Sequence, residues 1–319
     1  LVLLVRQAFR QRVEPRGRVP DRERRDLADV LARFWRQDDA DVFFLTGTDE
    51  HGQKISEEAS SRGMTPRELC DQMAARFRAA WEDLDISFDR FIRTTEPEHV
   101  AVVTTFLQRL WDKGVIYEGM YRGWYCVPEE RYWTEKDLGP DRTCPVCGRP
   151  TREIEEKNYF FRMSDCRDRL IGQIRDNPGW IWPDVRRNEV LGFLDQDLED
   201  LSISRPKARV PWGITLPWDD GHVAYVWVDA LINYVTAAGT IHPDNQPSRR
   251  GFDDTSGSWW PADVHLIGKD ILTTHAVYWP TLLMGAGLPL PRAIVAHGWW
   301  LTGEHKMSKS MGNVVDPLE

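Results

Sequence analysis

The chain has 319 residues, of which 41% are apolar and 29% charged, and it carries a net charge of −9. This balance is that of an ordinary globular protein with one large or two ordinary domains, and it argues against a protein that coats nucleic acid, which would be basic. No apolar run reaches the roughly 18 residues that a membrane-spanning helix needs. Leu1–Val5 is too short for the apolar core of a signal peptide, so we expect a cytoplasmic protein with no membrane partner.

Residues 1–26 differ from the rest of the chain. They contain eight arginines and no lysine, and they show no helical or strand periodicity, so we treat them as an atypical segment. The pattern changes at Leu27, because Leu27, Val30, Leu31 and Phe34 fall on one face of a helix. These residues predict an amphipathic helix.

A buried parallel strand is predicted at Asp41–Thr46, a short apolar run that is rich in β-forming residues and closed by Gly47. The next loop, Thr48–Gly52, would lie at the carboxyl end of that strand, where open α/β sheets bind ligands. Asp49 in this loop could hold a substrate ammonium group through charge-assisted hydrogen bonds. Aspartate also favours capped turns, so a purely structural role is the alternative.

A second helix is predicted at about 96–113, with Thr95 as its cap and Gly114 as its end. Its apolar stripe consists of Val100, Val103, Phe106, Leu107 and Leu110. From residue 117 to residue 220 the texture changes to short strands, recurrent proline and glycine, and one Cys-x-x-Cys pair. This segment indicates an inserted β-rich module.

Alternating helix and strand patterns, like those of residues 27–113, return after the insertion. The predicted elements are a helix that begins in Tyr225–Tyr234, a strand at Val264–Gly268, a helix at about 270–284 and a strand at Ala293–His297, with Pro243–Pro261 as an exposed loop. The order is half of an α/β sheet, an insertion and the other half. The sequence therefore predicts the α/β class, with a parallel sheet split by a β-rich insertion.

Two helical faces carry aromatic and apolar residues whose spacing brings them together. The first face has Trp227, Ala230, Leu231 and Tyr234, and the second has Ile271, His275 and Trp279 at i, i+4 and i+8. Such stripes are usually plain core, and a lone histidine among them usually has a structural hydrogen bond. The alternative is an aromatic-lined slot for an unbranched thioether, because sulfur makes favourable contacts with aromatic rings.

Two further patterns are typical of nucleotide sites. Gly268 would let the backbone approach a ligand just past a strand, and Asp270 could accept hydrogen bonds from ribose hydroxyls. The pentapeptide Lys306-Met-Ser-Lys-Ser310 places Lys306 and Lys309 where a mobile loop could close over phosphates. By charge alone, the pentapeptide would be interpreted as a solvated basic loop.

The five cysteines indicate reduced thiols or metal ligands, since no secretion signal is found. Cys144 and Cys147 have the spacing of half a zinc knuckle, and Cys126 lies upstream within reach of a hairpin. A structural zinc site needs four ligands. The sequence therefore leaves two possibilities, a bound Zn²⁺ ion or a knuckle that the fold alone holds together.

Several strings resemble one family. Lys306–Ser310, with Gly312-Asn313 after it, resembles the second signature of class I aminoacyl-tRNA synthetases, and Phe44–Lys54 resembles a loop of methionyl-tRNA synthetases. The same resemblance is found in Glu118–Cys126, Leu201–Lys207 and Val210–Gly213. It extends from about Leu27 to the end of the chain.

The resemblance implies a Rossmann-like class I fold and a ligase that uses ATP with Mg²⁺ to convert methionine to methionyl-adenylate and then acylates tRNA(Met). It divides the chain into the atypical segment 1–26, the first half of the catalytic domain at 27–116, a connective insertion at 117–220, the second half at 221–303, and the signature loop with a truncated C-terminus at 304–319.

The resemblance also implies site residues. The amino group of methionine would lie on Asp49, and the rest of methionine would lie among Val226, Trp227, Ala230, Leu231, Tyr234, Ile271, His275 and Trp279. The catalytic residues would be Lys306 and Lys309. ATP would contact Gly268, Asp270, Lys306, Ser308, Lys309 and Arg205.

The chain departs from the family pattern at three places. Glu129 stands where zinc-bearing relatives have a second cysteine, three residues after Cys126. The first family signature, His-x-Gly-His, is expected near Arg18–Asp21 and is absent; a shifted reading frame would explain Pro15–Pro20, and simple divergence is the alternative. The family continues into a helical anticodon-binding domain after the position that corresponds to Glu319, and we expect that domain to be missing from this polypeptide. We therefore expect this polypeptide alone to show little methionine-dependent ATP–pyrophosphate exchange.

Two alternatives remain at this level. Another class I synthetase (cysteinyl, or one of the leucine, isoleucine and valine group) would share the second signature, although the aromatic slot suits methionine better. An inactive fragment that retains methionine binding would agree with the missing histidine signature.

Overall fold

The computed structural model of the chain describes residues 4–5, 27–127, 129, 131–133, 135–241, 259–299, 301–302 and 305–306. The expected position of the histidine signature, the frame-shift hypothesis, and the predicted site residues Ser308 and Lys309 lie outside these residues. Most of the predicted loop at Pro243–Pro261 lies outside them as well.

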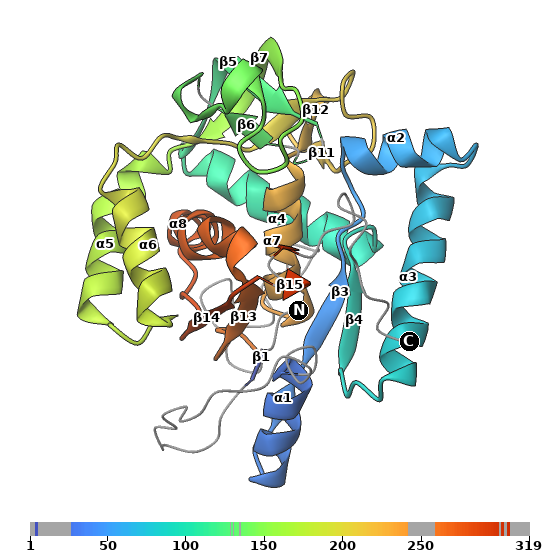
Figure 1. Cartoon of the computed structure of the whole chain (residues 1–319), viewed down its shortest axis with the longest axis vertical. Helices are drawn as coiled ribbons and strands as arrows, with labels where there is room; N and C mark the ends of the chain where they lie inside the picture. Colours follow the sequence, from blue (N-terminus) through green and yellow to red (C-terminus); the bar gives the residue numbers. More distant parts are fainter. Residues whose placement is uncertain are drawn as a thin grey trace.

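Parallel strand pairs form the centre of the molecule and confirm the predicted α/β class. The parallel pairs are β3 (Leu45–Thr48) with β4 (Arg90–Arg93), β13 (His265–Gly268) with β14 (Ile294–His297), and β14 with β8 (Ile181–Trp182). A short antiparallel pair joins β1 (Leu4–Val5) to β2 (Val42–Phe43). Figure 1 shows α7 (Val226–Ala237) between the β3–β4 pair and the β13–β14 pair.

Gly47 lies inside β3, so the predicted end of that strand at Gly47 was wrong. Gly47 is opposite Ile92 in the parallel register, and a Cβ atom at Gly47 would lie 2.1 Å from the carbonyl oxygen of Ile92. Only glycine lets the two backbones come this close. The strand can therefore continue to Thr48 and deliver Asp49 to its carboxyl end.

The helix α1 (Leu27–Gln37) forms as predicted, but only Leu27 and Leu31 of its predicted apolar stripe pack against the core. Val30 and Phe34, expected in the apolar stripe, are 52% and 50% exposed, whereas Ala28, Asp29 and Ala32 are buried. The carboxylate of Asp29 accepts a hydrogen bond from the backbone N–H of Ser87 at 2.7 Å. This buried polar contact, beside two small alanines, decides which face is buried.

Three more helices precede the insertion: α2 (Gln53–Ser61), α3 (Pro66–Asp83) and α4 (Pro97–Asp112). The stripe predicted for α4 is largely confirmed, since Val103, Phe106, Leu107 and Leu110 are fully buried. The predicted cap was wrong: Glu96 is the N-cap, and Thr95 instead uses its hydroxyl to hydrogen-bond Glu50. Gly114, with φ of +69°, follows the end of α4.

The segment predicted to be an insertion, 117–220, is β-rich in part. One sheet has the order β6 (Arg131–Trp133), β5 (Ile116–Cys126), β7 (Arg152–Phe161), β9 (Leu201–Ser202), and a second has the order β10 (Ser204–Pro206), β12 (Asp219–Ala224), β11 (Thr215–Leu216). Short 3₁₀ turns lie at Glu135–Asp137, Pro140–Arg142 and Ser164–Cys166. The strands β5 and β7, with 11 and 10 residues, are longer than the sequence indicated.

Two helices also lie within the segment expected to be β-rich. They are α5 (Arg167–Asp176) and α6 (Asp184–Leu194), with β8 between them. Because β8 pairs with β14, this stretch is continuous with the parallel sheet rather than with the antiparallel ones. In Figure 1 the strands β5, β6, β7, β11 and β12 gather at one end of the molecule, and α5 and α6 lie along one side.

The helix predicted at 270–284 is not regular. It consists of a 3₁₀ turn (Lys269–Ile271), a π-helical turn (Thr274–Tyr278) and α8 (Trp279–Ala286). A π turn accommodates more residues than an α turn and shifts everything that follows around the axis. The spacing argument that put Trp279 on the face of Ile271 and His275 therefore does not apply to Trp279.

The largest hydrophobic cluster surrounds α4, α7 and α8. Trp279 and Phe106 are fully buried in it, with ring centroids 6.3 Å apart. Beyond α8, β14 ends at His297, and a small hairpin pairs β15 (Leu301–Thr302) with β16 (His305–Lys306). No helix among the described residues is long and apolar enough to cross a membrane.

Candidate functional site

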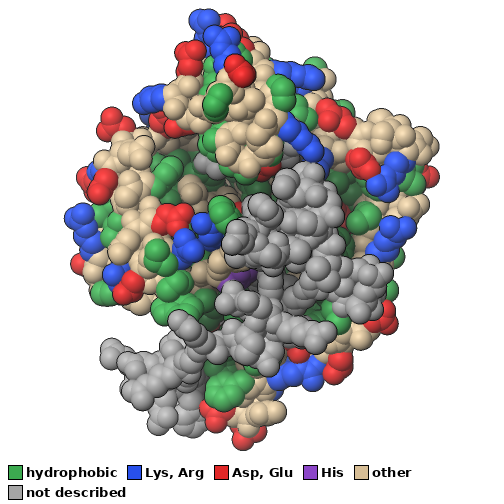
Figure 2. All heavy atoms as spheres, in the orientation of Figure 1, with side chains coloured by type: hydrophobic (Ala, Val, Ile, Leu, Met, Phe, Trp, Pro, Cys, Tyr) green, Lys and Arg blue, Asp and Glu red, His purple; other side chains and the backbone are tan. Residues whose placement is uncertain are grey.

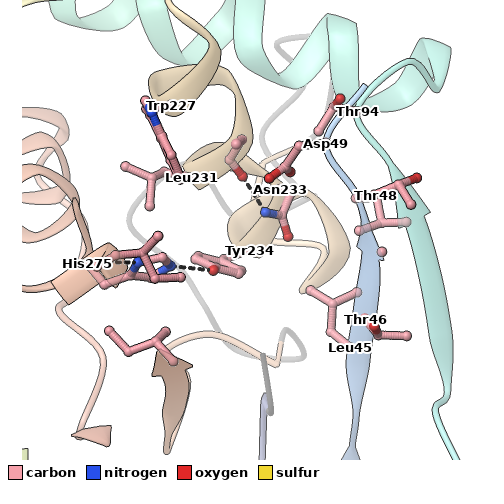
Figure 3. A pocket seen from close by; sticks show the side chains of 15 residues that line it. Leu45, Thr46, Thr48, Asp49, Thr94, Trp227, Leu231, Asn233, Tyr234 and His275 are labelled. Carbon is pink, nitrogen blue, oxygen red and sulfur yellow. Dashed lines mark hydrogen bonds between the residues drawn. The ribbon is translucent and has the colours of Figure 1, made fainter. Parts of the chain in front are cut away.

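A cavity of about 120 Å³ opens between β3, β4, α7 and the irregular helix after β13. Its lining consists of Leu45, Thr46, Gly47, Thr48, Asp49, Ile92, Thr94, Trp227, Ala230, Leu231, Asn233, Tyr234, Ile267, Ile271 and His275. In Figure 3, Trp227, Leu231 and His275 lie toward one side of the cavity, while Asp49, Thr94 and Asn233 gather on the other. The cavity thus has an apolar side and a polar side.

The structure brings together most of the residues predicted to bind methionine. Those that line the cavity are Asp49, Trp227, Ala230, Leu231, Tyr234, Ile271 and His275. Val226 and Trp279 are not in the lining. Trp279 lies behind Tyr234, with ring centroids 5.9 Å apart, and its indole N–H points to Nε2 of His265 at 3.2 Å. Trp279 is therefore a support of the cavity wall.

Sequence reasoning missed four residues that add polar atoms to the lining, Thr46, Thr48, Thr94 and Asn233. Thr94 follows β4, whose carboxyl end lies at the same sheet edge as Thr48. It was missed because the sequence analysis predicted no strand at Arg90–Arg93. Asn233 is three residues after Ala230, on the same face of α7. The helical periodicity that found Tyr234 could therefore also have found Asn233.

Asp49 is open to the cavity, yet protein atoms surround that space. The pKa of Asp49 is raised to about 6, first by burial and then by the negative charge of Asp229. At neutral pH the carboxylate is therefore mostly ionised but poorly solvated. A cation placed in the cavity would relieve both effects, because it offers charge and hydrogen bonds in place of water.

Tyr234 and His275 form a hydrogen bond of 2.7 Å between the hydroxyl and Nε2. The Nδ1 atom of His275 lies 3.0 Å from the carbonyl oxygen of Ile271, which can only accept. Burial lowers the pKa of His275 to about 4, so the ring is neutral at pH 7 and its single N–H is at Nδ1. The hydroxyl of Tyr234 must then donate to Nε2, which fixes both rings in the wall.

The loop that carries Asp49 is anchored on several sides. The carboxylate of Glu50, 2% exposed, accepts hydrogen bonds from Arg93 at 2.6 and 3.0 Å, and its backbone N–H donates to the Thr94 hydroxyl at 2.9 Å. The indole N–H of Trp212 donates to the carbonyl oxygen of Glu50 at 2.5 Å. The backbone N–H of Gly52, at φ of +116°, donates to the carbonyl oxygen of Trp212 at 3.0 Å. Glu50 is thus a structural anchor beside the functional Asp49 candidate.

The residues predicted for ATP are less well placed. Gly268 ends β13, and a Cβ atom there would lie 2.8 Å from Oδ1 of Asp270, which explains the glycine. Asp270 is exposed just after this strand end, beside the cavity but not in its lining. The backbone of Lys306 lies in β16 and pairs with Leu301. Ser308 and Lys309 lie outside the described residues.

Arg205 is buried, 3% exposed, and does not reach the cavity lining. Its guanidinium lies between two rings, 4.2 Å from the centroid of Tyr132 and 4.0 Å from that of Tyr225. It donates to the carbonyl oxygen of Ser204 at 2.6 Å, while its Nε atom is buried with no partner among the described residues. The phosphate contact expected of Arg205 stays a prediction.

Cys126, Cys144 and Cys147 come together at the end of the β5–β6 hairpin. Their sulfur atoms all lie within 4.8 Å of one another, and those of Cys126 and Cys147 are 3.5 Å apart. Burial is the main cause that raises the pKa of Cys126 and of Cys147. A bound cation would reverse this by favouring the thiolates. Thiol sulfurs at this spacing fit Zn²⁺, and the carboxylate of Glu129 does not join the cluster.

Figure 2 shows basic and acidic side chains interspersed along the edge of one face of the described protein. The net negative charge is therefore not concentrated at this edge. Hydrophobic side chains occupy much of the surface between the charged ones, as is usual for a folded protein.

A family model described as "tRNA synthetases class I (M)" matches residues 27–153 and 141–319 of the chain. The methionine–tRNA ligase of Thermotoga maritima is 46% identical over 295 residues, which cover 91% of this chain and 45% of that protein. The corresponding ligase of Clostridium tetani is 49% identical over 292 residues, which cover 91% of this chain and 44% of that protein.

A solved structure of Mycobacterium tuberculosis methionyl-tRNA synthetase in complex with methionyl-adenylate is similar in fold, with a TM-score of 0.84 and 45% sequence identity. The match covers 91% of this chain and 56% of that chain. The chain thus spans about half the length of the relatives that it matches. The family model, the relatives and the fold agree with the resemblance found in the sequence, and the chain belongs to the methionyl-tRNA synthetase family, in the class I catalytic region.

Proposed function

We propose that this chain is the catalytic region of a methionine–tRNA ligase, an enzyme that activates methionine with ATP and Mg²⁺ for transfer to tRNA(Met), and that the chain binds methionine in the cavity beside Asp49. The observation that carries the proposal is the placement of one ionisable carboxylate, Asp49, at the polar side of a small cavity whose other side is formed by Trp227, Leu231 and His275. Methionine has an ammonium group at one end and an unbranched thioether at the other, so its chemistry matches both sides.

Asp49 would hold the ammonium group of methionine by charge and hydrogen bonding, because its carboxylate is open to the cavity and otherwise poorly solvated. Tyr234, Trp227 and Ile271 would surround the thioether, since aromatic rings and sulfur attract each other. The hydrogen bond between Tyr234 and His275 holds the ring of Tyr234 in place before a ligand enters. Preorganisation of this kind reduces the entropy cost of binding.

The nucleotide would lie next to the methionine site, past the carboxyl end of β13. Gly268 would let the nucleotide approach the backbone, and the exposed Asp270 would accept hydrogen bonds from ribose hydroxyls. Lys306 and Lys309, with Ser308, would close over the phosphates, and Arg205 would act from the insertion side. Ions at transferring phosphates stabilise the charge that builds up during the reaction.

Cys126, Cys144 and Cys147 would hold one structural Zn²⁺ ion, with a fourth ligand from outside the cluster. The metal would join the β5–β6 hairpin to the Cys144–Cys147 turn, which lies in a segment with little apolar core of its own. This proposal rests on the spacing of the three sulfur atoms. The Zn²⁺ ion would stabilise the fold and would take no part in the reaction.

The test is isothermal titration calorimetry of L-methionine, L-leucine, L-cysteine and a sulfamoyl analogue of methionyl-adenylate into the chain. We expect methionine to bind, leucine and cysteine to bind at least about tenfold more weakly, and the adenylate analogue to bind about 100-fold more tightly than methionine, because it occupies two linked sites. Equal affinity for leucine would favour another class I synthetase. An analogue no tighter than methionine would mean that the nucleotide half is missing, as in an inactive methionine-binding fragment.

A further inference from the structure

Asp229 is a second carboxylate close to the cavity, and the mechanism proposed above does not use it. It lies in the first turn of α7 and is 1% exposed. Two histidines from other parts of the chain contact its two oxygens. Nδ1 of His51 lies 2.6 Å from Oδ2, and Nε2 of His99 lies 2.8 Å from Oδ1.

The same chain of hydrogen bonds continues into α7. Nδ1 of His99 lies 3.0 Å from the hydroxyl oxygen of Thr236, and that hydroxyl is 3.1 Å from the carbonyl oxygen of Ile232. His51 belongs to the loop that carries Asp49, His99 to α4, and Asp229 to α7. A single buried network, His51–Asp229–His99, therefore ties three separate elements together next to Asp49.

The geometry restricts where Asp49 can lie. Glu50 is fixed on one side of the loop by Arg93 and Thr94, and His51 is fixed on the other by Asp229. Asp49 immediately precedes Glu50 and lies two residues before His51. Its carboxylate is thus directed into the cavity by neighbours that are themselves buried and bonded.

The charges near Asp49 also indicate that this network acts on Asp49. Two ionised carboxylates in one buried region repel each other, so Asp229 without compensation would weaken the ionisation of Asp49. Burial would raise the pKa of Asp229, but hydrogen bonds and charge from His51 and His99 outweigh it, and the pKa is lowered. The titratable groups that face Asp49 and Asp229 among the described residues are Glu50, His51, His99 and Tyr234.

We propose that the His51–Asp229–His99 network is a positioning device for Asp49, which fixes its loop against α7 and α4 and sets the pH range over which the cavity accepts an ammonium group. The inference rests on the proposed role of Asp49 in methionine binding. His51, His99 and Asp229 act through Asp49 and do not touch the ligand. A network with a purely structural role would have the same contacts. The test must therefore measure a property that a purely structural role would leave unchanged.

That readout is the pH dependence of methionine binding, measured by calorimetry with the chain over roughly pH 5 to 8. Because the pKa of Asp49 is about 6, methionine should bind about tenfold more weakly at pH 5 than at pH 7. The desamino analogue of methionine, which has no ammonium group, should not show this loss. Asp229→Asn removes the negative charge next to Asp49. The midpoint of the pH dependence of methionine binding should therefore fall by roughly 1 pH unit, and the loss of affinity between pH 7 and pH 5 should shrink to about twofold.

His51→Gln provides a second variant that does not depend on the folding of Asp229→Asn. It removes one of the two partners that offset the charge of Asp229, so the midpoint should rise instead of fall. His222→Gln is the matched control, because His222 is bonded to Asp219 at 2.7 Å in another His–Asp pair, outside the cavity. The control should leave the midpoint where it is in the parent chain.

The outcomes separate the two claims. If the parent chain does not bind methionine at any pH, the proposed function fails. If the parent chain binds methionine and Asp229→Asn and His51→Gln lower the affinity equally at every pH with the midpoint unchanged, the network is structural only and this inference is overturned. Midpoints that move in opposite directions in the two variants, with His222→Gln unchanged, would establish it.

Discussion

The hydroxyl of Tyr234 donates a 2.7 Å hydrogen bond to Nε2 of His275 across the wall of the cavity. The direction of this bond follows from the other nitrogen of the ring, which must donate to the carbonyl oxygen of Ile271. Tyr234 is therefore committed as a donor to the protein, and only its oxygen lone pairs and its ring remain for a ligand. A cavity built in this way favours apolar and aromatic contact at that end over a new donated hydrogen bond.

Tyr234→Phe should lower the free energy of unfolding by about 1–3 kcal/mol, because it leaves Nε2 of His275 buried without a donor. Tyr278→Phe is the matched control, since the hydroxyl of Tyr278 makes no hydrogen bond to the residues that the structure describes and lies one turn away. The control should cost less than about 0.5 kcal/mol. Urea denaturation followed by tryptophan fluorescence measures both, and equal costs would show that the hydrogen bond is not important.

Glu50→Gln should destabilise the chain by about 3 kcal/mol, because it leaves the charge of Arg93 without its buried partner. The exposed pair of Arg122 and Glu153, 3.4 Å apart, provides the comparison, and Glu153→Gln should cost less than about 1 kcal/mol. Chemical denaturation at constant pH gives the two values. A small cost for Glu50→Gln would mean that the Asp49 loop is held mainly by Trp212.

The chain should purify with one zinc ion per molecule, and Cys126→Ser or Cys144→Ser should abolish the metal, because each removes one of the three clustered thiols. Cys166→Ser, at a cysteine outside the cluster, should keep it. Metal content is measured by inductively coupled plasma mass spectrometry after dialysis. A metal-free parent chain that melts at the same temperature before and after added zinc would contradict the zinc proposal and support a knuckle held by the fold.

Stability should decrease as the pH falls from 7 to 5, because His275 and His265 are buried and neutral. Burial lowers the pKa of both, to about 4 for His275, against 6.5 without burial. The unfolded chain then binds more protons than the folded one below pH 6.5, and stability is lost in that window. Asp49, with its raised pKa, acts in the opposite direction and offsets part of the loss.

The expected loss between pH 7 and pH 5 is about 2 kcal/mol. His275→Gln removes one of the two histidine contributions, so the loss of stability should be visibly smaller in that variant. Denaturation curves at the two pH values measure the difference. A His275→Gln chain with the same pH dependence as the parent would show that His275 does not titrate as its burial requires.

The sequence predicted those features that follow from local pattern. The period of α4 and the shared face of Trp227, Leu231 and Tyr234 each depend on residues within a few turns of one another, and the structure agrees. These patterns, together with the family strings, placed seven of the fifteen residues that line the cavity.

The features that escaped prediction depend on distant contacts. The buried face of α1 is decided by Asp29 and Ser87, 58 residues apart, and His51 meets Asp229 across 178 residues. No periodicity encodes such pairs, because they arise only when the sheet and α7 have come together. The π turn at Thr274–Tyr278 failed prediction for another reason, since it changes the period on which the prediction for Trp279 relied.

The central claim is that the cavity holds methionine through its ammonium group on Asp49. The most direct measurement is a pair of calorimetric titrations at pH 7, of L-methionine and of its desamino analogue, into the parent chain and into Asp49→Asn. Asp49→Asn should weaken the binding of methionine by about 100-fold and the binding of the desamino analogue by less than about threefold, because only methionine carries the ammonium group that the carboxylate binds. Equal losses for both ligands, or an Asp49→Asn chain that binds methionine as tightly as the parent, would contradict the claim.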